Sequence, residues 1–205
     1  MKHTGIRLLA MAAALAVGLI SQASAVTFTF LENGTGDLGS STATFTESGL
    51  TLTAGGFGTP AANLWGKNDG PGETGLGLSV DAGGDNEIDK DHFVQFDSHL
   101  SPSGTTSSLI LGSVQGAGEA AAVYGSNTWG IRGNLLPTGP LDGNDNVNLS
   151  GWLGTYRFFS VTTIGANADA NVLLGSVSAT VPDGGTTSLL LGLGLISLAI
   201  IRRKR

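Results

Sequence analysis

The feature that most constrains the fold is a series of short apolar segments between residues 26 and 180, separated by glycine-rich turns. Val26–Phe30, Thr42–Phe45 and Leu50–Thr53 are rich in β-branched, aromatic and other apolar residues in alternation, which is typical of strands. No window outside the two chain ends has the 3.6-residue period of a helix. The pattern predicts an all-β fold, a single antiparallel β-sandwich of jelly-roll-like type over residues 26–180.

Later segments extend this prediction. His92–Asp97 alternates with Phe93 out of phase with Val94 and Phe96, so one of these faces belongs to the core. Gly75–Leu78 is expected to be a strand that another backbone approaches closely, because it carries two glycines. Leu109–Val114 and Val172–Val177 look alike and are expected to be buried central strands, since two copies are too few for a solenoid. Trp129 and Trp152 are expected to anchor the core.

The N-terminal end has the three parts of a secretory signal peptide. Lys2 and Arg7 precede an apolar stretch from Leu8 to Ile20, and Ala23 and Ala25 form the A-x-A pattern of a cleavage site. We therefore predict a signal peptide over residues 1–25 and a mature chain that begins at Val26. Export of this kind implies the Sec translocon and signal peptidase as partners.

The C-terminal end, residues 181–205, also has three parts. A turn-forming motif of Val181, Pro182, Asp183, Gly184 and Gly185 precedes a mostly apolar run over residues 186–201. As a helix this run would span about 24 Å, slightly short of the bilayer core, and flanking cations can close the gap. The basic tail 202–205 would hold the C-terminus on the cytoplasmic side of the inner membrane; its residues are Arg202, Arg203, Lys204 and Arg205.

This tail resembles the PEP-CTERM class of bacterial sorting signals, in the variant with a Val-Pro-Asp-Ser-Gly motif. Gly184 stands where that variant usually has serine, and Asp183 stands where the main class has glutamate. The resemblance implies recognition by an exosortase, a membrane cysteine protease or transpeptidase. It also implies that the membrane-anchored precursor is then released or transferred to the cell surface or extracellular matrix. A plain membrane anchor is the alternative interpretation of the same helix.

The charge of the region between the targeting segments excludes one class of partner. Residues 26–182 contain four basic and fifteen acidic side chains, a formal net charge of −11. Nucleic-acid binding needs a basic surface that displaces phosphate counterions, so it is not expected. The acidity suits solubility outside the cell or divalent cations. The chain has no cysteine, so disulfides cannot stabilise it.

An acidic segment is the candidate metal site. Asp81, Asp85, Glu87 and Asp89 carry the hard oxygen ligands that calcium requires, and the last three, with Asp91, would share one face of an extended chain. Carboxylates about 7 Å apart on a straight strand cannot all reach one ion unless the chain turns. A solvated acidic loop is the alternative. The loop from Asp142 is excluded as an EF-hand, because Val147 stands where that motif needs glycine.

Catalysis finds little support in the sequence. His92 and His99 are seven residues apart, which matches neither a zinc-binding helix nor a catalytic triad, and each is expected to be a strand or surface residue. Glu73 and Glu87 could form the carboxylate pair of a glycoside hydrolase, but any acidic protein offers such pairs by chance. We therefore predict no enzyme and no cofactor other than the candidate calcium.

The function expected from these observations is that of an exported, exosortase-sorted protein of the surface or extracellular matrix. Its role would be structural or adhesive in a biofilm, with exopolysaccharide as a candidate partner. The alternative is a carbohydrate-binding module with structural calcium. Trp65 is the aromatic residue through which that alternative can be tested.

Overall fold

The computed structural model describes residues 24–80, 84–100, 104–114, 119–164 and 170–181. The strands belong to a compact unit, Ala25–Thr180, and a second unit comprises Met1–Ser24 and Val181–Arg205. Ala25 of the predicted cleavage site is exposed in the first strand. The rest of the predicted signal peptide other than Ser24, and the predicted helix over 186–201, lie outside the described residues. Among the residues described, no helix is long and apolar enough to cross a membrane.

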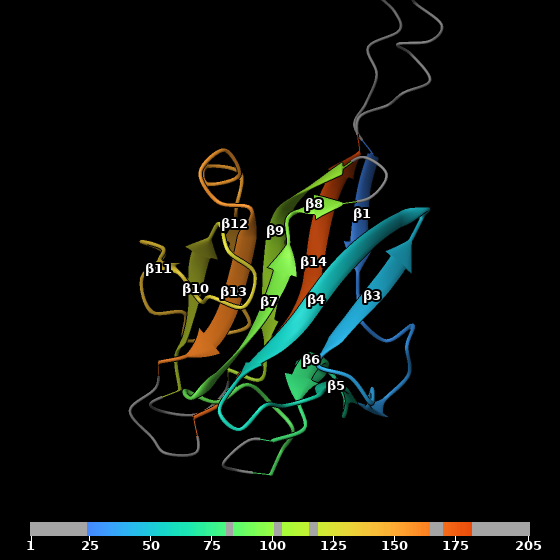
Figure 1. The fold of residues 1–205 in the computed structure, drawn as a ribbon, viewed down its shortest axis with the longest axis vertical. Helices are drawn as coiled ribbons and strands as arrows, with labels where there is room; N and C mark the ends of the chain where they lie inside the picture. Colours follow the sequence, from blue (N-terminus) through green and yellow to red (C-terminus); the bar gives the residue numbers. More distant parts are fainter. Residues whose placement is uncertain (1–23, 81–83, 101–103, 115–118, 165–169, 182–205) are drawn as a thin grey trace, which may run out of the picture. The chain divides into compact units, whose positions relative to one another are not determined.

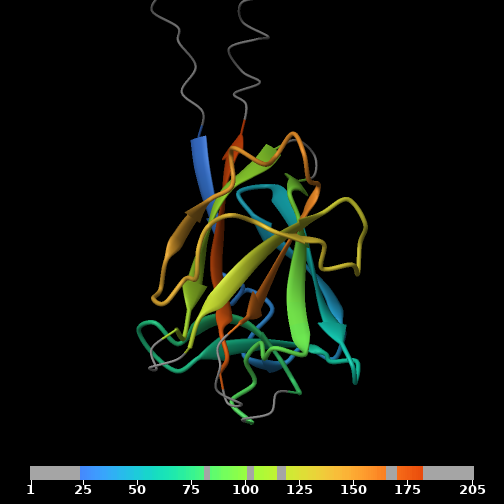
Figure 2. The ribbon, with the colours of Figure 1, turned by 90° about the vertical axis from the view of Figure 1, so that its left-hand side faces the viewer.

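The strands form two sheets; Figure 1 labels strands where there is room, and Figure 2 shows the ribbon turned by 90°. Sheet A has the order β12-β9-β14-β6-β5-β2, with β1 beside β14 and β8 beside β9. Its strands are β1 (Ser24–Phe28), β2 (Gly36–Asp37), β5 (Leu64–Asn68), β6 (Thr74–Leu78), β8 (His99–Leu100), β9 (Gly104–Gly112), β12 (Asn146–Asn148) and β14 (Leu173–Val181). Sheet B has the order β11-β10-β13-β7-β4-β3. Its strands are β3 (Thr42–Glu47), β4 (Leu50–Gly58), β7 (His92–Asp97), β10 (Ala121–Ser126), β11 (Asn134–Leu135) and β13 (Phe158–Thr163).

The two sheets pack face to face, as predicted for a sandwich. The large side chains with no exposed surface come from both sheets, among them Leu52 and Phe96 of sheet B and Leu64 and Leu78 of sheet A. A Cβ atom on Gly56 of β4 would lie 2.3 Å from Leu78 Cδ2 of β6, so the sheets touch there. The all-β, two-sheet antiparallel architecture is confirmed. The jelly-roll-like arrangement stays a prediction.

The two segments that look alike in sequence are neighbours in sheet A. Leu111 of β9 pairs with Leu174 of β14, and Leu109 pairs with Val177. Both strands have neighbours on each side, as expected of central strands. The expectation that both are buried on both faces is wrong for β9, because Ile110 is 38% exposed.

The outer face of sheet B is covered by the segment between β10 and β11. Gln95 of β7 is fully buried there; its side-chain amide donates to Ile131 O at 2.9 Å and accepts from Gly130 N at 2.7 Å. Trp129 lies in the same segment, edge to face with Phe57 at 5.4 Å between ring centroids. Trp129 and Trp152 are only half-buried. The ring contacts of Trp129 are with Phe57 and Phe158 on the outer face of sheet B. The prediction that both tryptophans anchor the core is therefore wrong.

Candidate functional site

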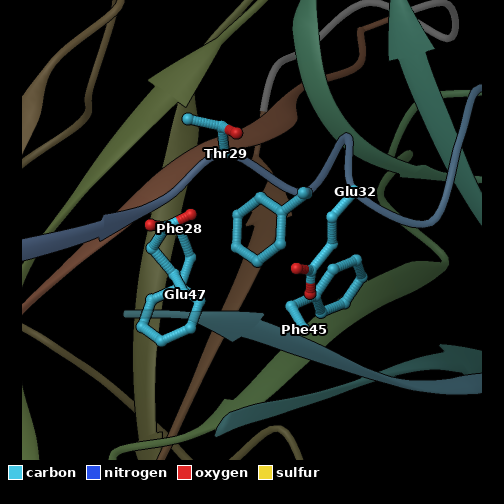
Figure 3. A pocket seen from close by; sticks show the side chains of 6 residues that line it. Phe28, Thr29, Glu32, Phe45 and Glu47 are labelled. Atoms are coloured by element: carbon cyan, nitrogen blue, oxygen red, sulfur yellow. The ribbon is translucent and has the colours of Figure 1, made fainter. Parts of the chain in front are cut away.

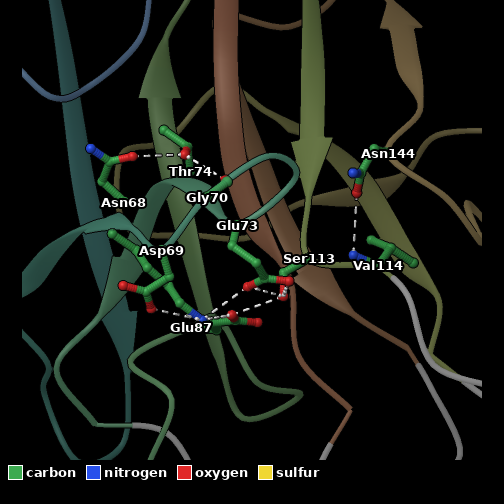
Figure 4. Close-up of polar contacts among 10 residues, drawn as sticks. Asn68, Asp69, Gly70, Glu73, Thr74, Glu87, Ser113, Val114 and Asn144 are labelled. Atoms are coloured by element: carbon green, nitrogen blue, oxygen red, sulfur yellow. Dashed lines mark hydrogen bonds and ion pairs between the residues drawn. The ribbon is translucent and has the colours of Figure 1, made fainter.

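A group of buried and partly buried ionisable side chains in the described residues gathers around Lys67, whose partners Glu73, Glu87 and Ser113 are labelled in Figure 4. Within β5, Leu64 is buried against the interior, so Trp65 and Lys67 point to the outer face of sheet A. Three other segments bring partners to this face: Glu73 precedes β6, Glu87 precedes β7, and Ser113 follows β9. We call these four residues the Lys67 cluster.

The members of the Lys67 cluster are linked directly. Lys67 Nζ donates to Glu73 Oε2 at 3.0 Å and also contacts Glu87 Oε1. The Ser113 hydroxyl lies 2.8 Å from Glu87 Oε1 and 2.9 Å from Glu73 Oε2, so it can donate to either carboxylate. Exposed side-chain fractions are 2% for Glu87, 11% for Lys67 and 26% for Glu73. The cluster is thus closed on the Glu87 side and opens to solvent at Glu73.

Backbone geometry holds Glu87 and Ser113 in this cluster. The segment before β7 crosses β6 at Gly77, where an added Cβ would lie 2.1 Å from Asn86 O. Asn86 has a φ of 60°, which turns the chain there, and Ile88 exchanges two backbone hydrogen bonds with Val172. Ser113 has a φ of 61°, and its N–H donates to Gly72 O at 2.7 Å. The predicted close approach to the Gly75–Leu78 strand is therefore observed.

Two carboxylates hydrogen-bond to the one ammonium of the cluster, and the exposed Asp69 forms a third, longer ion pair with it at 3.8 Å. Glu73 and Glu87 differ in ionisation because they differ in burial and in hydrogen bonding. Burial raises the pKa of Glu87 to about 7, against the opposing hydrogen bond from Lys67. For Glu73, burial is outweighed by hydrogen bonds from Lys67 and Ser113, which lower its pKa. Burial is also outweighed at Lys67, whose pKa is raised by hydrogen bonds to both glutamates. Near pH 7 the cluster thus holds an ammonium, an ionised Glu73 and a Glu87 divided between its acid and its carboxylate.

This arrangement does not suit glycoside hydrolysis, although the structure brings together the Glu73 and Glu87 pair that the sequence suggested. A glycosidase keeps its two carboxyl groups about 5 Å or more apart with the sugar between them. Here Ser113 Oγ is within 3.0 Å of both carboxylates, and Lys67 contacts both. The space that a sugar would need is filled by these two side chains.

The candidate calcium ligands do not converge in the described residues. Glu87 faces Lys67, whereas Asp89 accepts hydrogen bonds from the backbone N–H groups of Asp91 and His92. Asp85 is exposed, and Asp81 lies outside the described residues. The acidic segment turns rather than extends, so the expected shared face does not form. No group of three or more metal-ligating side chains is found within the part of the chain that is described, and the calcium hypothesis stays a prediction.

His92 forms a second buried polar contact, which the sequence did not indicate. It lies in β7, as expected for a strand residue, but is only 4% exposed. Its Nδ1 is 2.8 Å from Asp89 Oδ1 and its Nε2 is 2.9 Å from Pro60 O. Both ring nitrogens therefore have hydrogen-bond partners within the protein. This contact ties β7 to the chain after β4.

Two hollows in the described surface differ in what they can hold. The one in Figure 3, lined by Phe28, Phe45 and Glu32 among others, has a volume of about 10 Å³ and has room for no more than one water. A shallow groove of about 320 Å³ lies beside the Lys67 cluster. Its lining includes the half-buried Trp65 together with the polar side chains of Asn68, Asp69, Asp85 and Asn86.

The predicted sorting signal can be compared with known proteins. Val181 ends β14, and the remaining motif residues and the basic tail lie outside the described residues. No curated protein and no solved structure matches the chain. The family model of the VPDSG-CTERM motif matches residues 180–205, at the C-terminal end only. Such a motif points to export to the cell surface and to processing by exosortase-type machinery. Residues 180–205 are therefore a VPDSG-CTERM motif, a variant of the PEP-CTERM-like exosortase sorting signal.

Proposed function

We propose that this chain is cargo of the exosortase pathway, a non-enzymatic β-sandwich with a structural or adhesive role in the extracellular matrix. The membrane-anchored precursor is cut near Pro182, and the folded domain is passed to the cell surface. The observation that carries the proposal is the VPDSG-CTERM motif at residues 180–205. The N-terminal signal pattern and the strongly acidic, cysteine-free region between the two ends also support export.

Mass spectrometry of the exported protein tests the sorting step. We expect the mature N-terminus at Val26 and a C-terminus near Pro182, so that peptides from residues 186–205 are missing from the surface form. The same peptides should be present in a strain without its exosortase. If the surface form in the wild-type strain retains residues 186–205, the proposal of exosortase cargo is wrong.

A carbohydrate-binding module is the second candidate function, and the groove beside Trp65 favours it. An indole next to carboxylate and amide side chains offers a stacking surface and hydrogen-bond partners for sugar hydroxyls. Exopolysaccharide would be the ligand, and sorting would deliver the module to it. The notion that calcium supports this module rests on the acidic segment alone.

Glycan-array binding tests this second candidate. Wild type should bind at least one polysaccharide, and Trp65→Ala should lose most of that binding. Trp152→Ala is the matched control, because Trp152 is also half-buried but does not line the groove. Absence of binding by wild type would exclude this candidate while leaving the sorting proposal intact. Melting in excess calcium and in chelator tests the calcium part, since a ligand of the native state raises the melting temperature.

A further inference from the structure

The Lys67 cluster contains everything that a condensation between two side chains requires. An amine, a carboxyl group and a third group that accepts protons lie in mutual contact: Lys67, Glu87 and Glu73. The carboxyl group to be attacked is 2% exposed, so bulk water is excluded from it. We propose that Lys67 Nζ and Glu87 Cδ form an amide bond, so that the mature domain carries an internal lysine–glutamate cross-link.

The step balances without any reagent from outside. The reacting state has a Lys67 ammonium, an ionised Glu73 and Glu87 as its neutral acid. Glu73 takes one proton from the ammonium, and the free amine attacks Glu87 Cδ. The C–N bond forms, the C–OH bond of Glu87 breaks, and the hydroxyl leaves as water with a second proton from the nitrogen. The products are the amide, one water and the neutral acid of Glu73, with no change in oxidation state.

Each neighbouring residue has a defined part in this step. Glu73 contacts the reacting nitrogen at 3.0 Å and is the more exposed carboxylate, so it can pass its proton on to solvent. The Ser113 hydroxyl, 2.8 Å from Glu87 Oε1, can donate to the oxygen on which negative charge develops. The backbone contacts at Gly77 and Ile88 hold Glu87 against the amine, and fixed proximity of this kind raises the rate of a condensation by many orders of magnitude.

The cross-link would serve a domain that has no other covalent tie, since the chain contains no cysteine. It would join β5, a strand of sheet A, to the segment that leads into β7, a strand of sheet B. Closing the loop from residue 67 to residue 87 would limit the unfolded chain in the way that a disulfide does.

Mass spectrometry of the purified full chain tests the cross-link. We expect an intact mass one water lower than that of the linear sequence with the same termini. Trypsin does not cut after an acylated lysine, so Lys67 and Glu87 should remain in one peptide that ends at Lys90. A succinimide at Asp69-Gly70 would also lose water but would leave cleavage after Lys67 unchanged. An intact mass equal to that of the linear sequence, together with cleavage after Lys67, would overturn the proposal.

Three variants separate the chemistry from folding. Lys67→Arg keeps the cation but cannot form this amide, so it should have the full linear mass. Lys90→Arg is the matched control at an exposed lysine and should keep the loss of water. Glu73→Gln should fold but condense more slowly, because the proton acceptor is gone. If Lys67→Arg still loses the water and fragmentation of the peptide places that loss at Glu87 rather than at Asp69-Gly70, the assignment of Lys67 is wrong.

Discussion

Lys67 shows how a single residue takes its chemistry from neighbours distant in sequence. Its exposed fraction, 11% for the side chain, is low for a lysine. The two carboxylates to which it donates, Glu73 and Glu87, come from a turn and from a separate segment, and the exposed Asp69 lies 3.8 Å from it. Burial raises the pKa of Glu87 to about 7 although Lys67 opposes the shift, so the more deeply buried acid is partly protonated near neutral pH. A neutral carboxyl group held beside an amine is what makes the cluster reactive in our proposal.

Condensation in this cluster should be fastest below pH 7. The pKa of Glu87 is raised to about 7 by burial, so its neutral acid predominates below that pH and declines above it. The pKa of Glu73 is lowered, so Glu73 remains an ionised proton acceptor over the same range. For a chain recovered from inclusion bodies in denaturant, which still has its full linear mass, and then refolded, the rate of water loss should fall about tenfold per pH unit above pH 7. A time course of intact mass at pH 6 and pH 9 measures this, and equal rates would contradict the assigned roles.

Gly77 lies where β6 and the segment that carries Glu87 approach each other, and a side chain at this position would push the two apart. A Cβ there would lie 2.1 Å from Asn86 O, a backbone atom that cannot move aside without shifting Glu87. Gly77→Ala should therefore lower the free energy of unfolding by about 1–3 kcal/mol, as overpacking does elsewhere. Urea denaturation measures the change. Gly154→Ala is the control, because nothing lies within 4 Å of its added Cβ; equal effects of the two substitutions would mean that the close approach is unimportant.

At the scale of the strands, the local sequence pattern predicted where strands lie but not which strands pair with one another. The segment His92–Asp97 coincides with β7, and Phe93 faces away from Val94 and Phe96 as its phase indicated. Alternation identifies such strands because side chains on a strand point to opposite faces in turn. It does not identify β7's neighbours β4 and β13, because sheet pairing joins residues far apart in the chain.

The candidate site was less predictable for the same reason. The sequence placed carboxylates at every second position from Asp85 and suggested one shared face. Instead, the chain turns at Asn86, and the backbone N–H groups of the two residues that follow Lys90 donate to the Asp89 carboxylate. Glu87 and Asp89 therefore have different partners. Lys67 and Ser113, which complete the cluster, lie twenty and twenty-six residues from Glu87, beyond the reach of any local pattern.

The segment that covers sheet B depends on one side chain, which gives a prediction for an element. Gln95 is fully buried and bonds to Gly130 N, Ile131 O and the Ser160 hydroxyl. Gln95→Ala leaves these groups without that partner and should cost about 1–3 kcal/mol. The amide of Gly130 should lose protection in hydrogen exchange, while amides between β7 and β13 keep theirs. Asn33→Ala, which removes an exposed side-chain bond to Thr44 O, should change neither.

For the whole molecule, the sorting signal and the folded domain occupy separate parts of the sequence. The described core lies in the unit Ala25–Thr180, and the VPDSG-CTERM match covers residues 180–205. A sandwich with its own buried core does not need the sorting tail for stability, because the apolar area removed from water belongs to the strands. In the proposed sorting step the tail would act through its sequence and its affinity for the membrane. The two functions should therefore be separable by truncation.

A chain that ends at Val181 tests this separation. It keeps all of β14, so its melting temperature should match that of the full-length domain within error. In cells it should be exported through the predicted signal peptide but appear in the medium rather than at the cell surface, as immunoblots of the two fractions would show. Gly184→Ser, which restores the usual residue of the variant motif, is the matched control and should be sorted at least as well as wild type. If the truncated chain were retained at the surface at the wild-type level, the folded domain would contain its own sorting signal, and the tail would be dispensable for sorting.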